Sequence, residues 1–291
     1  MPGGVQCKAA ESVPKEAHQL MTTTIRPASD LPISAPPTHQ TLVGTGARSV
    51  TSPKRLARIA GVLYLFVAIF GGFAEGFVDP KMYVAGNAAA AAGNVVANAG
   101  LVRLGVVAHL LDATFFIFLA LTIYILLQHV HKTLASAMVV LVALATGIKA
   151  VNAIFLFEGL QVATNSSYAA AFGTAGSNAL VLLLLDTQHY GTLIAQVFFG
   201  LWLAPLGYLA YKSSGMFPRW LGVLLIAAAA CYVVDLLAAF LIPDVAAMIH
   251  PFVGILVPAI AEISMLLYLL IIGVKTNEKT LKPGERILAA A

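Results

Sequence analysis

Charged residues are scarce in this chain. Only 10% of its 291 residues are Asp, Glu, Lys or Arg, whereas about a quarter are charged in a typical soluble domain. Hydrophobic residues make up 59% of the sequence, and the mean hydropathy is +0.88. This composition excludes an ordinary soluble domain and predicts an integral membrane protein with several spans in a lipid bilayer.

Cysteine is also scarce, and common catalytic motifs are missing. Cys7 lies in a polar tail and Cys231 in an apolar stretch, so the cysteines offer neither a disulfide framework nor a metal site. The sequence has no phosphate loop, dinucleotide fingerprint, Ser-His-Asp order or zincin motif. The net charge of +4 does not indicate a nucleic-acid partner, because the positive residues lie in tails and short loops.

The two ends of the chain differ from its middle. Residues 1–55 are rich in Pro, Ser, Thr and Gly and show no apolar periodicity, so we predict a disordered N-terminal tail. They lack the charged start and apolar run of a signal peptide, and Met21 offers an alternative start. A transmembrane domain is expected at 56–274 and a short C-terminal tail at 275–291.

Six apolar segments approach the roughly 20 residues that a helix needs to cross a bilayer. They are 57–78, 101–127, 134–157, 186–211, 219–242 and 251–273. The predicted fold class is therefore all-α, with six transmembrane helices. The fourth helix has an apolar extension at 179–185, and the connections 82–100 and 158–177 are long enough to carry short helices over the core.

Positively charged residues are concentrated before the first segment, in every second connection between segments, and after the last segment. They are Arg48, Lys54, Arg55, Arg58, Lys132, Lys212, Arg219, Lys275, Lys279, Lys282 and Arg286, whereas the opposite loops hold Lys81 and Arg103. An excess of Lys and Arg marks the cytoplasmic side of a membrane. We therefore expect both termini in the cytoplasm and the protein in the inner (plasma) membrane.

Ionisable and amide side chains interrupt the apolar segments. They are Glu75, Arg103, His109, Asp112, Lys149, Asn152, Asp186, His189, Asp235 and Glu262. An ionised group in hydrocarbon costs at least about 2.5 kcal/mol, so these groups must meet one another, water or a bound species. With about 1.5 Å of rise per residue, they fall in the outer half of the membrane. The sequence thus predicts an outward-facing polar pocket to which all six helices contribute.

Two His–Asp pairs stand out within this set. His109 and Asp112, like Asp186 and His189, are three residues apart and so lie on one helix face. Two imidazoles and two carboxylates suit zinc, iron or manganese, and they also suit a proton relay. In a third reading, each pair is an intrahelical hydrogen bond that only neutralises its own polar groups.

Lys149 lies far from either surface of the predicted membrane, so it needs a carboxylate partner. Asp112, Asp235 and Glu262 lie at similar depth. The lysine either joins helices through a buried ion pair, or it lines an anion site or moves with protons. Because carboxylates outnumber fixed cations here, the site is expected to hold protons, a metal ion or a cationic ligand.

The stretch from Leu182 to Asp235, with VFFGL, LGYL and PRWLGVLL, resembles the bacterial membrane family known as domain of unknown function 4386. ARIAGVLYL before Glu75 and GNAAAAAGNVVANAGLVRLG before His109 are similar in kind to its earlier stretches. The resemblance covers about 55–274 and implies a six-helix inner-membrane protein without an established activity. In the family, a His often lies two residues after the Asp that corresponds to Asp186. Here Gln188 occupies that position, and the His is one residue later, at His189.

Three functional hypotheses remain open. The first, which we favour, is a membrane protein that binds a small ligand, an ion or a proton in its polar pocket. The second is a membrane-embedded metal hydrolase that acts on a lipid-like substrate, with His109, Asp112, Asp186 and His189 as metal ligands. The third is a structural or sensory partner protein whose polar core only holds its helices together.

Overall fold

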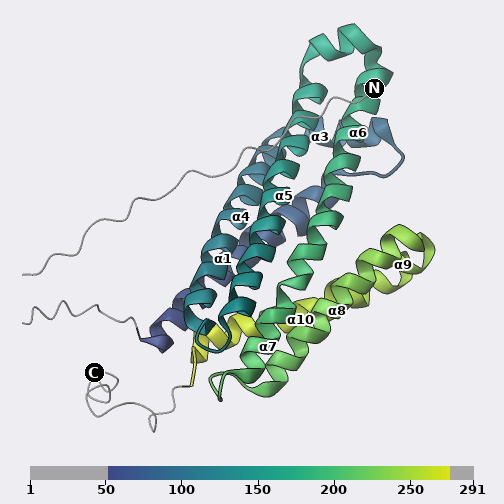
Figure 1. Ribbon diagram of the computed structural model, residues 1–291. Coiled ribbons are helices and arrows are strands. Elements are labelled where there is room, and N and C mark those ends of the chain that lie inside the picture. The colour runs from purple at the N-terminus through teal and green to yellow at the C-terminus, as the bar shows by residue number, and fades with distance from the viewer. Residues whose placement is uncertain (1–51, 276–291) are drawn as a thin grey trace, which may run out of the picture. The chain divides into compact units, whose positions relative to one another are not determined.

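The computed structural model describes residues 52–275, which are almost entirely helical and contain no strand (Figure 1). Six helical stretches are long and apolar enough to cross a membrane, which confirms the predicted fold class. They are Pro53–Met82, Ala99–Leu127, Lys132–Thr164, Ser166–Lys212, Arg219–Leu241 and Pro243–Ile272. The alternative start at Met21 and nearly all of both predicted tails lie outside the described residues.

Some of these stretches contain several helical elements. The first comprises α1 (Pro53–Phe73), the π-helical turn η1 (Ala74–Val78) and α2 (Asp79–Met82); a short α3 (Ala88–Ala97) precedes α4 (Ala99–Leu127). Helix α5 (Lys132–Thr164) is followed by α6 (Ser166–Leu201), α7 (Leu203–Lys212) and α8 (Arg219–Leu241). The last stretch comprises α9 (Pro243–His250), η2 (Pro251–Leu256), α10 (Val257–Leu267) and η3 (Tyr268–Ile272).

Local sequence explains where several helices begin. At α1, the Ser52 side chain accepts a hydrogen bond from the Arg55 amide at 3.3 Å, and Pro53 occupies the first helical position. Proline is tolerated there because that amide has no partner within the helix. At α3, the Asn87 side chain likewise accepts from the Ala90 amide at 3.0 Å. Both are side-chain caps of unpaired helix N–H groups.

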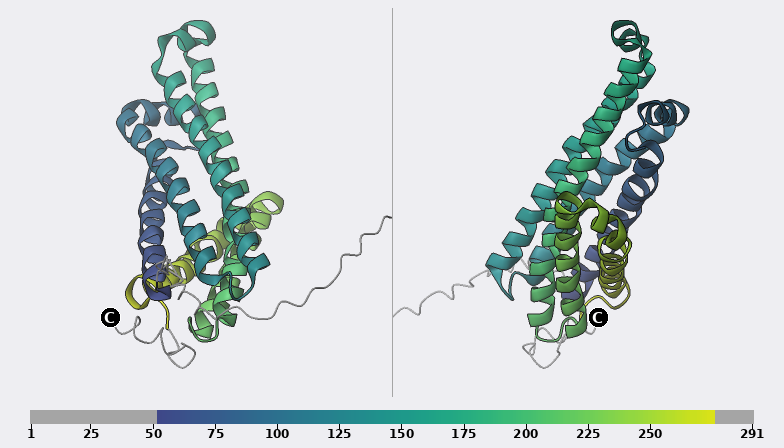
Figure 2. Two further views of the ribbon diagram at one scale, coloured as in Figure 1. Left: turned by 60° about the vertical axis from the view of Figure 1, so that its left-hand side comes forward. Right: turned by 90° about the vertical axis from the view of Figure 1, so that its right-hand side faces the viewer.

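The connection at 158–177 is shorter than predicted, but it does carry a short helix. Helix α5 continues to Thr164 and α6 begins at Ser166, with Asn165 alone between them. The Asn165 side chain accepts from the Ser167 amide at 3.0 Å and so caps the new helix. Gly173 has a φ of 71° and interrupts α6, so a short helix at 166–172 joins α5 to the long part of α6. The apolar run at 179–185 continues that long helix, which is one of the two forms that the sequence allows. Figure 2 shows the hairpin of α5 and α6 extending beyond the other helices.

The spans pack as a series of antiparallel neighbours. Helix α4 packs against α1 and α5, and α5 packs against α6. Helix α8 contacts α6, α7 and α10, while η3 returns to pack against α1. The last span therefore closes the arrangement against the first, and every span has neighbours that can bury polar side chains.

The buried apolar residues form two separate clusters. The first cluster lies near the end where α1 begins and includes Phe116, Met138, Trp202, Leu225 and Leu269. The second lies toward the α5–α6 hairpin and includes Val78, Val95, Val102, Leu156 and Leu185. Along α4, His109 and Asp112 fall between Val102 of the second cluster and Phe116 of the first.

The polar groups on α4 thus have apolar residues on both sides. The second of these clusters, formed by α3 and the lengthened α5 and α6 with neighbouring residues, was not predicted from the sequence. A pocket that opens at the outer end of the helices stays a prediction. Hereafter "polar layer" means the residues Glu75, Asp79, His109, Asp112, Lys149, Asn152, Asp186, Gln188, His189, Gln196, Asp235, His250 and Glu262.

Candidate functional site

Lys149 stands at the centre of the polar layer. Its side chain, on α5, is 5% exposed. The ammonium group lies 2.8 Å from Oε1 of Glu75 on η1 and is also paired with Asp112 on α4. Of the three partners that the sequence suggests, Asp112 contacts Lys149, whereas Asp235 and Glu262 bind other groups. Two carboxylates therefore share one ammonium group at the junction of three helices.

The second oxygen of Asp112 has no hydrogen-bond partner among residues 52–275. Asp112 is 1% exposed, yet its Oδ1 atom is buried without a donor. Gly71 of α1 faces it closely, since a Cβ atom at that position would lie 3.2 Å from Oδ1. A buried carboxylate oxygen without a partner keeps its full desolvation penalty. This oxygen is therefore available to a proton or to a small cation.

A second network is centred on Asp79, at the start of α2. Its Oδ1 atom lies 3.1 Å from Nε2 of His109, and its Oδ2 atom accepts a hydrogen bond from Gln188 at 2.7 Å. The predicted intrahelical His109–Asp112 bond is absent among the described contacts. The reason is that Glu75 on η1 and Asp79 on α2 both reach this part of the bundle. Asp79 pairs with His109, whereas Asp112 pairs with Lys149, which Glu75 also contacts.

Asp186 and His189 both contact Tyr83, in the connection between α2 and α3. Asp186 accepts a 2.7 Å hydrogen bond from the Tyr83 hydroxyl, and the His189 ring stacks on the Tyr83 ring with centroids 4.7 Å apart. Burial raises the pKa of Tyr83 well above its ordinary value, and the bond to Asp186 raises it further. The two α6 residues thus meet through a tyrosine and not through each other.

The four suggested metal ligands are not brought together. His109 faces Asp79, Asp112 faces Lys149, and Asp186 and His189 face Tyr83. Within residues 52–275, no three side chains of His, Cys, Asp or Glu converge in a way that would hold a metal ion. The arrangement therefore gives no support to a divalent-metal centre built on these four residues.

A third group joins α8, α6 and the last span around Asp235. The Asp235 side chain is 2% exposed. It accepts from Gln196 at 3.1 Å, and both of its oxygens lie 3.0 Å from Nδ1 of His250. Gly254 leaves room for this pair, because a Cβ atom there would lie 2.4 Å from His250 Nδ1 and 2.6 Å from Asp235 Oδ2.

Glu262, on α10, is held by two tyrosines. Tyr64 of α1 and Tyr232 of α8 each donate a hydrogen bond of 2.9 Å to its carboxylate. A chain of ring contacts then runs from one tyrosine to the other through Trp202, Phe116 and Phe199. The Phe199 ring also lies 5.4 Å from the Lys149 ammonium group, so it links the Glu262 group to the central lysine.

Two further predicted site residues differ in their surroundings. Asn152 is 6% exposed, and its amide lies 3.4 Å from both the Gln188 carbonyl and the Thr192 hydroxyl. Arg103 is exposed and forms no ion pair with any other residue between 52 and 275. Asn152 thus belongs to the polar layer, whereas Arg103 does not.

Several contributing residues do not stand out in the sequence. They are Tyr64, Asp79, Tyr83, Gln188, Gln196, Tyr232 and His250. Asp79 follows Glu75 by one helical turn just past the predicted first span, and that spacing is a usable signal. His250 lies one residue before the predicted sixth span, which in fact begins at Pro243. The tyrosines and glutamines carry no charge that would mark them within an apolar helix.

The sequence model of the family described as domain of unknown function (DUF4386) matches residues 59–273. The chain belongs to this family. In this DUF4386 protein the matched region contains every residue of the polar layer and reaches into all six spans, which confirms the resemblance seen in the sequence. No curated protein and no solved structure matches the chain.

Proposed function

We propose that this protein binds a proton, or another small cation, in its polar layer. The observation that carries the proposal is the triad in which Glu75 and Asp112 share the single ammonium group of Lys149. The triad has a formal charge of minus one, and the side chains of Lys149 and Asp112 are buried, whereas that of Glu75 is 34% exposed. Burial of an uncompensated charge is strongly unfavourable, and a bound proton or cation removes that charge.

The composition of the whole layer supports the same conclusion. The layer contains six carboxyl groups (Glu75, Asp79, Asp112, Asp186, Asp235 and Glu262) but only one lysine and three histidines. Even if all three imidazoles were protonated, two negative charges would remain. This excess of negative charge favours uptake of positive charge, and the buried Oδ1 atom of Asp112, which has no partner among the described residues, is well placed to receive it.

Infrared spectroscopy of the purified full-length protein at neutral pH tests this proposal, since a protonated carboxyl group absorbs apart from a carboxylate. We expect a carboxylic-acid band in the unmodified protein and a weaker band in Asp112→Asn. Asp244→Asn is the matched control, because Asp244 is exposed at the start of α9, and it should leave the band unchanged.

Sodium, potassium and tetramethylammonium chlorides separate a proton from a metal cation. If a small metal cation competes for the site, sodium or potassium will weaken the carboxylic-acid band, whereas bulky tetramethylammonium will not. A protein whose carboxyl groups are all ionised, and whose spectrum responds to none of these salts, would contradict the proposal. That result would favour a purely structural polar layer.

A further inference from the structure

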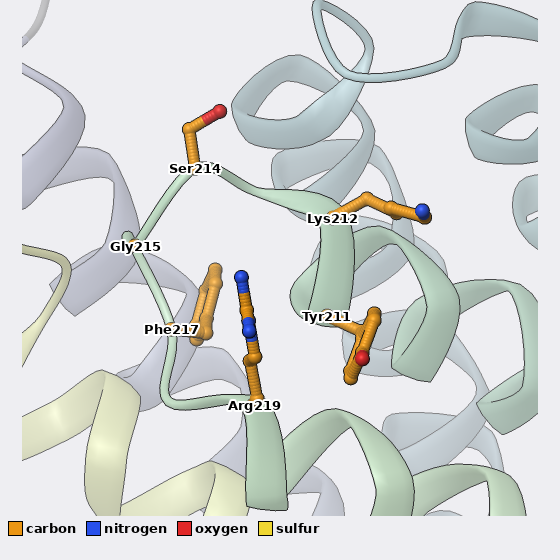
Figure 3. A pocket seen from close by; sticks show the side chains of 6 residues that line it. All are labelled: Tyr211, Lys212, Ser214, Gly215, Phe217 and Arg219. Carbon is orange, nitrogen blue, oxygen red and sulfur yellow. The ribbon is translucent and has the colours of Figure 1, made fainter.

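A separate cavity lies at the turn between α7 and α8 (Figure 3). This turn is at the opposite end of the helices from the α5–α6 hairpin (Figure 1). It has a volume of about 420 Å³. Its lining residues are Tyr211, Lys212, Ser214, Gly215, Phe217 and Arg219. None of them belongs to the polar layer, so this cavity needs an explanation of its own.

Of the residues that the structure describes, two cationic side chains and no carboxylate line the cavity. Lys212 lies 6.0 Å from the Tyr208 ring, and the Arg219 guanidinium lies 5.7 Å from the Tyr211 ring. Neither is paired with an acidic residue within the described part of the chain. In Figure 3 the Arg219 side chain points from the start of α8 toward the loop and lies beside Phe217. The Lys212 side chain points away from the loop. Both groups keep donors free for an anion.

The loop that forms the cavity is held in place at several points. The Ser213 hydroxyl donates to the Ala210 carbonyl at 2.6 Å and accepts from the Phe217 amide at 3.3 Å. The Met216 carbonyl accepts from the Tyr268 hydroxyl and from the Lys275 amide. Ser214 has a φ of 53°, a conformation unusual for a residue with a side chain. A strained residue persists only where its surroundings fix it, so the cavity is preformed.

The cavity also lies at a boundary between apolar and polar surroundings. The fourth candidate span ends at Lys212 and the fifth begins at Arg219. Next to it Trp220 is 58% exposed, and Val223, one turn further along α8, is 55% exposed. Tryptophan is enriched at the level of lipid headgroups. A ligand with an anionic head and an apolar tail would therefore match both the cavity and the adjoining helix face.

From these observations we infer that the α7–α8 cavity binds the phosphate headgroup of an anionic glycerophospholipid. The Arg219 guanidinium donates to the phosphate oxygens in the paired geometry that suits this group. Lys212 supplies a second positive charge from a long flexible stem. The acyl chains lie along the exposed face of α8 at Trp220 and Val223. This inference does not depend on cation binding in the polar layer.

Native mass spectrometry of the full-length protein in a neutral detergent tests the inference. Phosphatidylglycerol and phosphatidylcholine of equal chain length are the probes, and phosphatidylglycerol should bind more tightly. Since one basic residue near a membrane surface is worth about a five-fold change in affinity, Arg219→Gln should weaken phosphatidylglycerol binding about five-fold. The double variant Lys212→Gln/Arg219→Gln should weaken it about thirty-fold.

Lys132→Gln is the matched control, because Lys132 is an exposed basic residue at the start of α5. It should bind phosphatidylglycerol as the unmodified protein does. Arg219→Lys keeps the charge but removes the paired donors, so its affinity should lie between those of the unmodified protein and Arg219→Gln. Circular dichroism verifies that each variant is folded.

Two outcomes would overturn the inference. One is equal affinity of the double variant and Lys132→Gln for phosphatidylglycerol. The other is displacement of phosphatidylglycerol by inorganic phosphate at equal concentration, because the cavity would then recognise free phosphate and not a lipid.

Discussion

At the scale of single residues, Lys149 decides whether the polar layer is compatible with a membrane interior. Its ammonium group contacts two carboxylates from two other helices and lies beside the Phe199 ring. Removal of one partner from a buried ion pair is strongly destabilising, because the remaining charge loses its compensation. Here the loss would leave two carboxylates facing each other.

We therefore predict that Lys149→Leu lowers the free energy of unfolding by about 3–5 kcal/mol, measured by thermal or denaturant unfolding in detergent. Lys81→Leu is the control, because Lys81 is exposed near the end of the first span, and it should change stability by less than about 0.5 kcal/mol.

A triple variant shows whether the charge or the packing is responsible. Adding Glu75→Gln and Asp112→Asn to Lys149→Leu removes the unpaired carboxylates, so most of the lost stability should return. If the triple variant were as unstable as Lys149→Leu, the lysine would act mainly through packing, and the electrostatic account of the layer would be wrong.

At the scale of elements, the π-helical turns place groups that a regular helix would direct elsewhere. A π-helical turn inserts a residue relative to the α-helical repeat and often occurs at functional sites. η1 carries Glu75 and leads into Asp79, while η2 directly follows His250 and contains Gly254. Two of the three described π-turns thus adjoin the polar layer.

Close approach between the first and last spans depends on Gly61. A Cβ atom there would lie 2.6 Å from the Leu270 amide nitrogen, which belongs to the backbone and cannot rotate away. We predict that Gly61→Ala separates α1 from η3 and destabilises the protein by about 1–3 kcal/mol, as measured by thermal unfolding.

Gly72 provides the matched control in the same helix. A Cβ atom at Gly72 would meet nothing within 4 Å, so Gly72→Ala should be neutral or stabilise by up to about 1 kcal/mol through helix propensity. Similar losses in both variants would mean that glycine flexibility, and not close packing, is needed in α1.

At the scale of the whole molecule, six candidate spans lead us to expect both termini on one side of the membrane. The positive residues in the connections favour the cytoplasmic side. This orientation is a prediction, because it depends on charge and not on the helical packing itself. The chain has two cysteines, Cys7 and Cys231, which makes the prediction convenient to test.

With Cys231 replaced by serine, Cys7 reports the N-terminal side. We expect a membrane-impermeant maleimide to label Cys7 only after cells are permeabilised. A variant with Phe172→Cys and without the native cysteines should be labelled in intact cells, because Phe172 is 61% exposed near the α5–α6 turn. Labelling of Cys7 in intact cells would reverse the proposed orientation.

The sequence could predict the spans and most of the buried carboxylates, but not their partners. His109 and Asp112 share a helix face, and their spacing suggests contact with each other. In the fold, His109 contacts Asp79 and Asp112 contacts Lys149, and both partners belong to other elements. Tyr64, Tyr232 and Gln196 were not predicted because a neutral polar side chain in an apolar helix gives no sign of its burial.

What the sequence alone determined was the membrane character, the six spans, the family and the presence of costly polar groups within apolar helices. These properties follow from composition and from hydrophobic length, which are local. The tertiary structure decided that the polar groups of α4 lie between two apolar clusters and that Lys149 joins Glu75 with Asp112. Such pairings depend on helix rotation, on the π-turns and on the length of the α5–α6 hairpin, because side chains from helices far apart in the chain meet only once those helices pack.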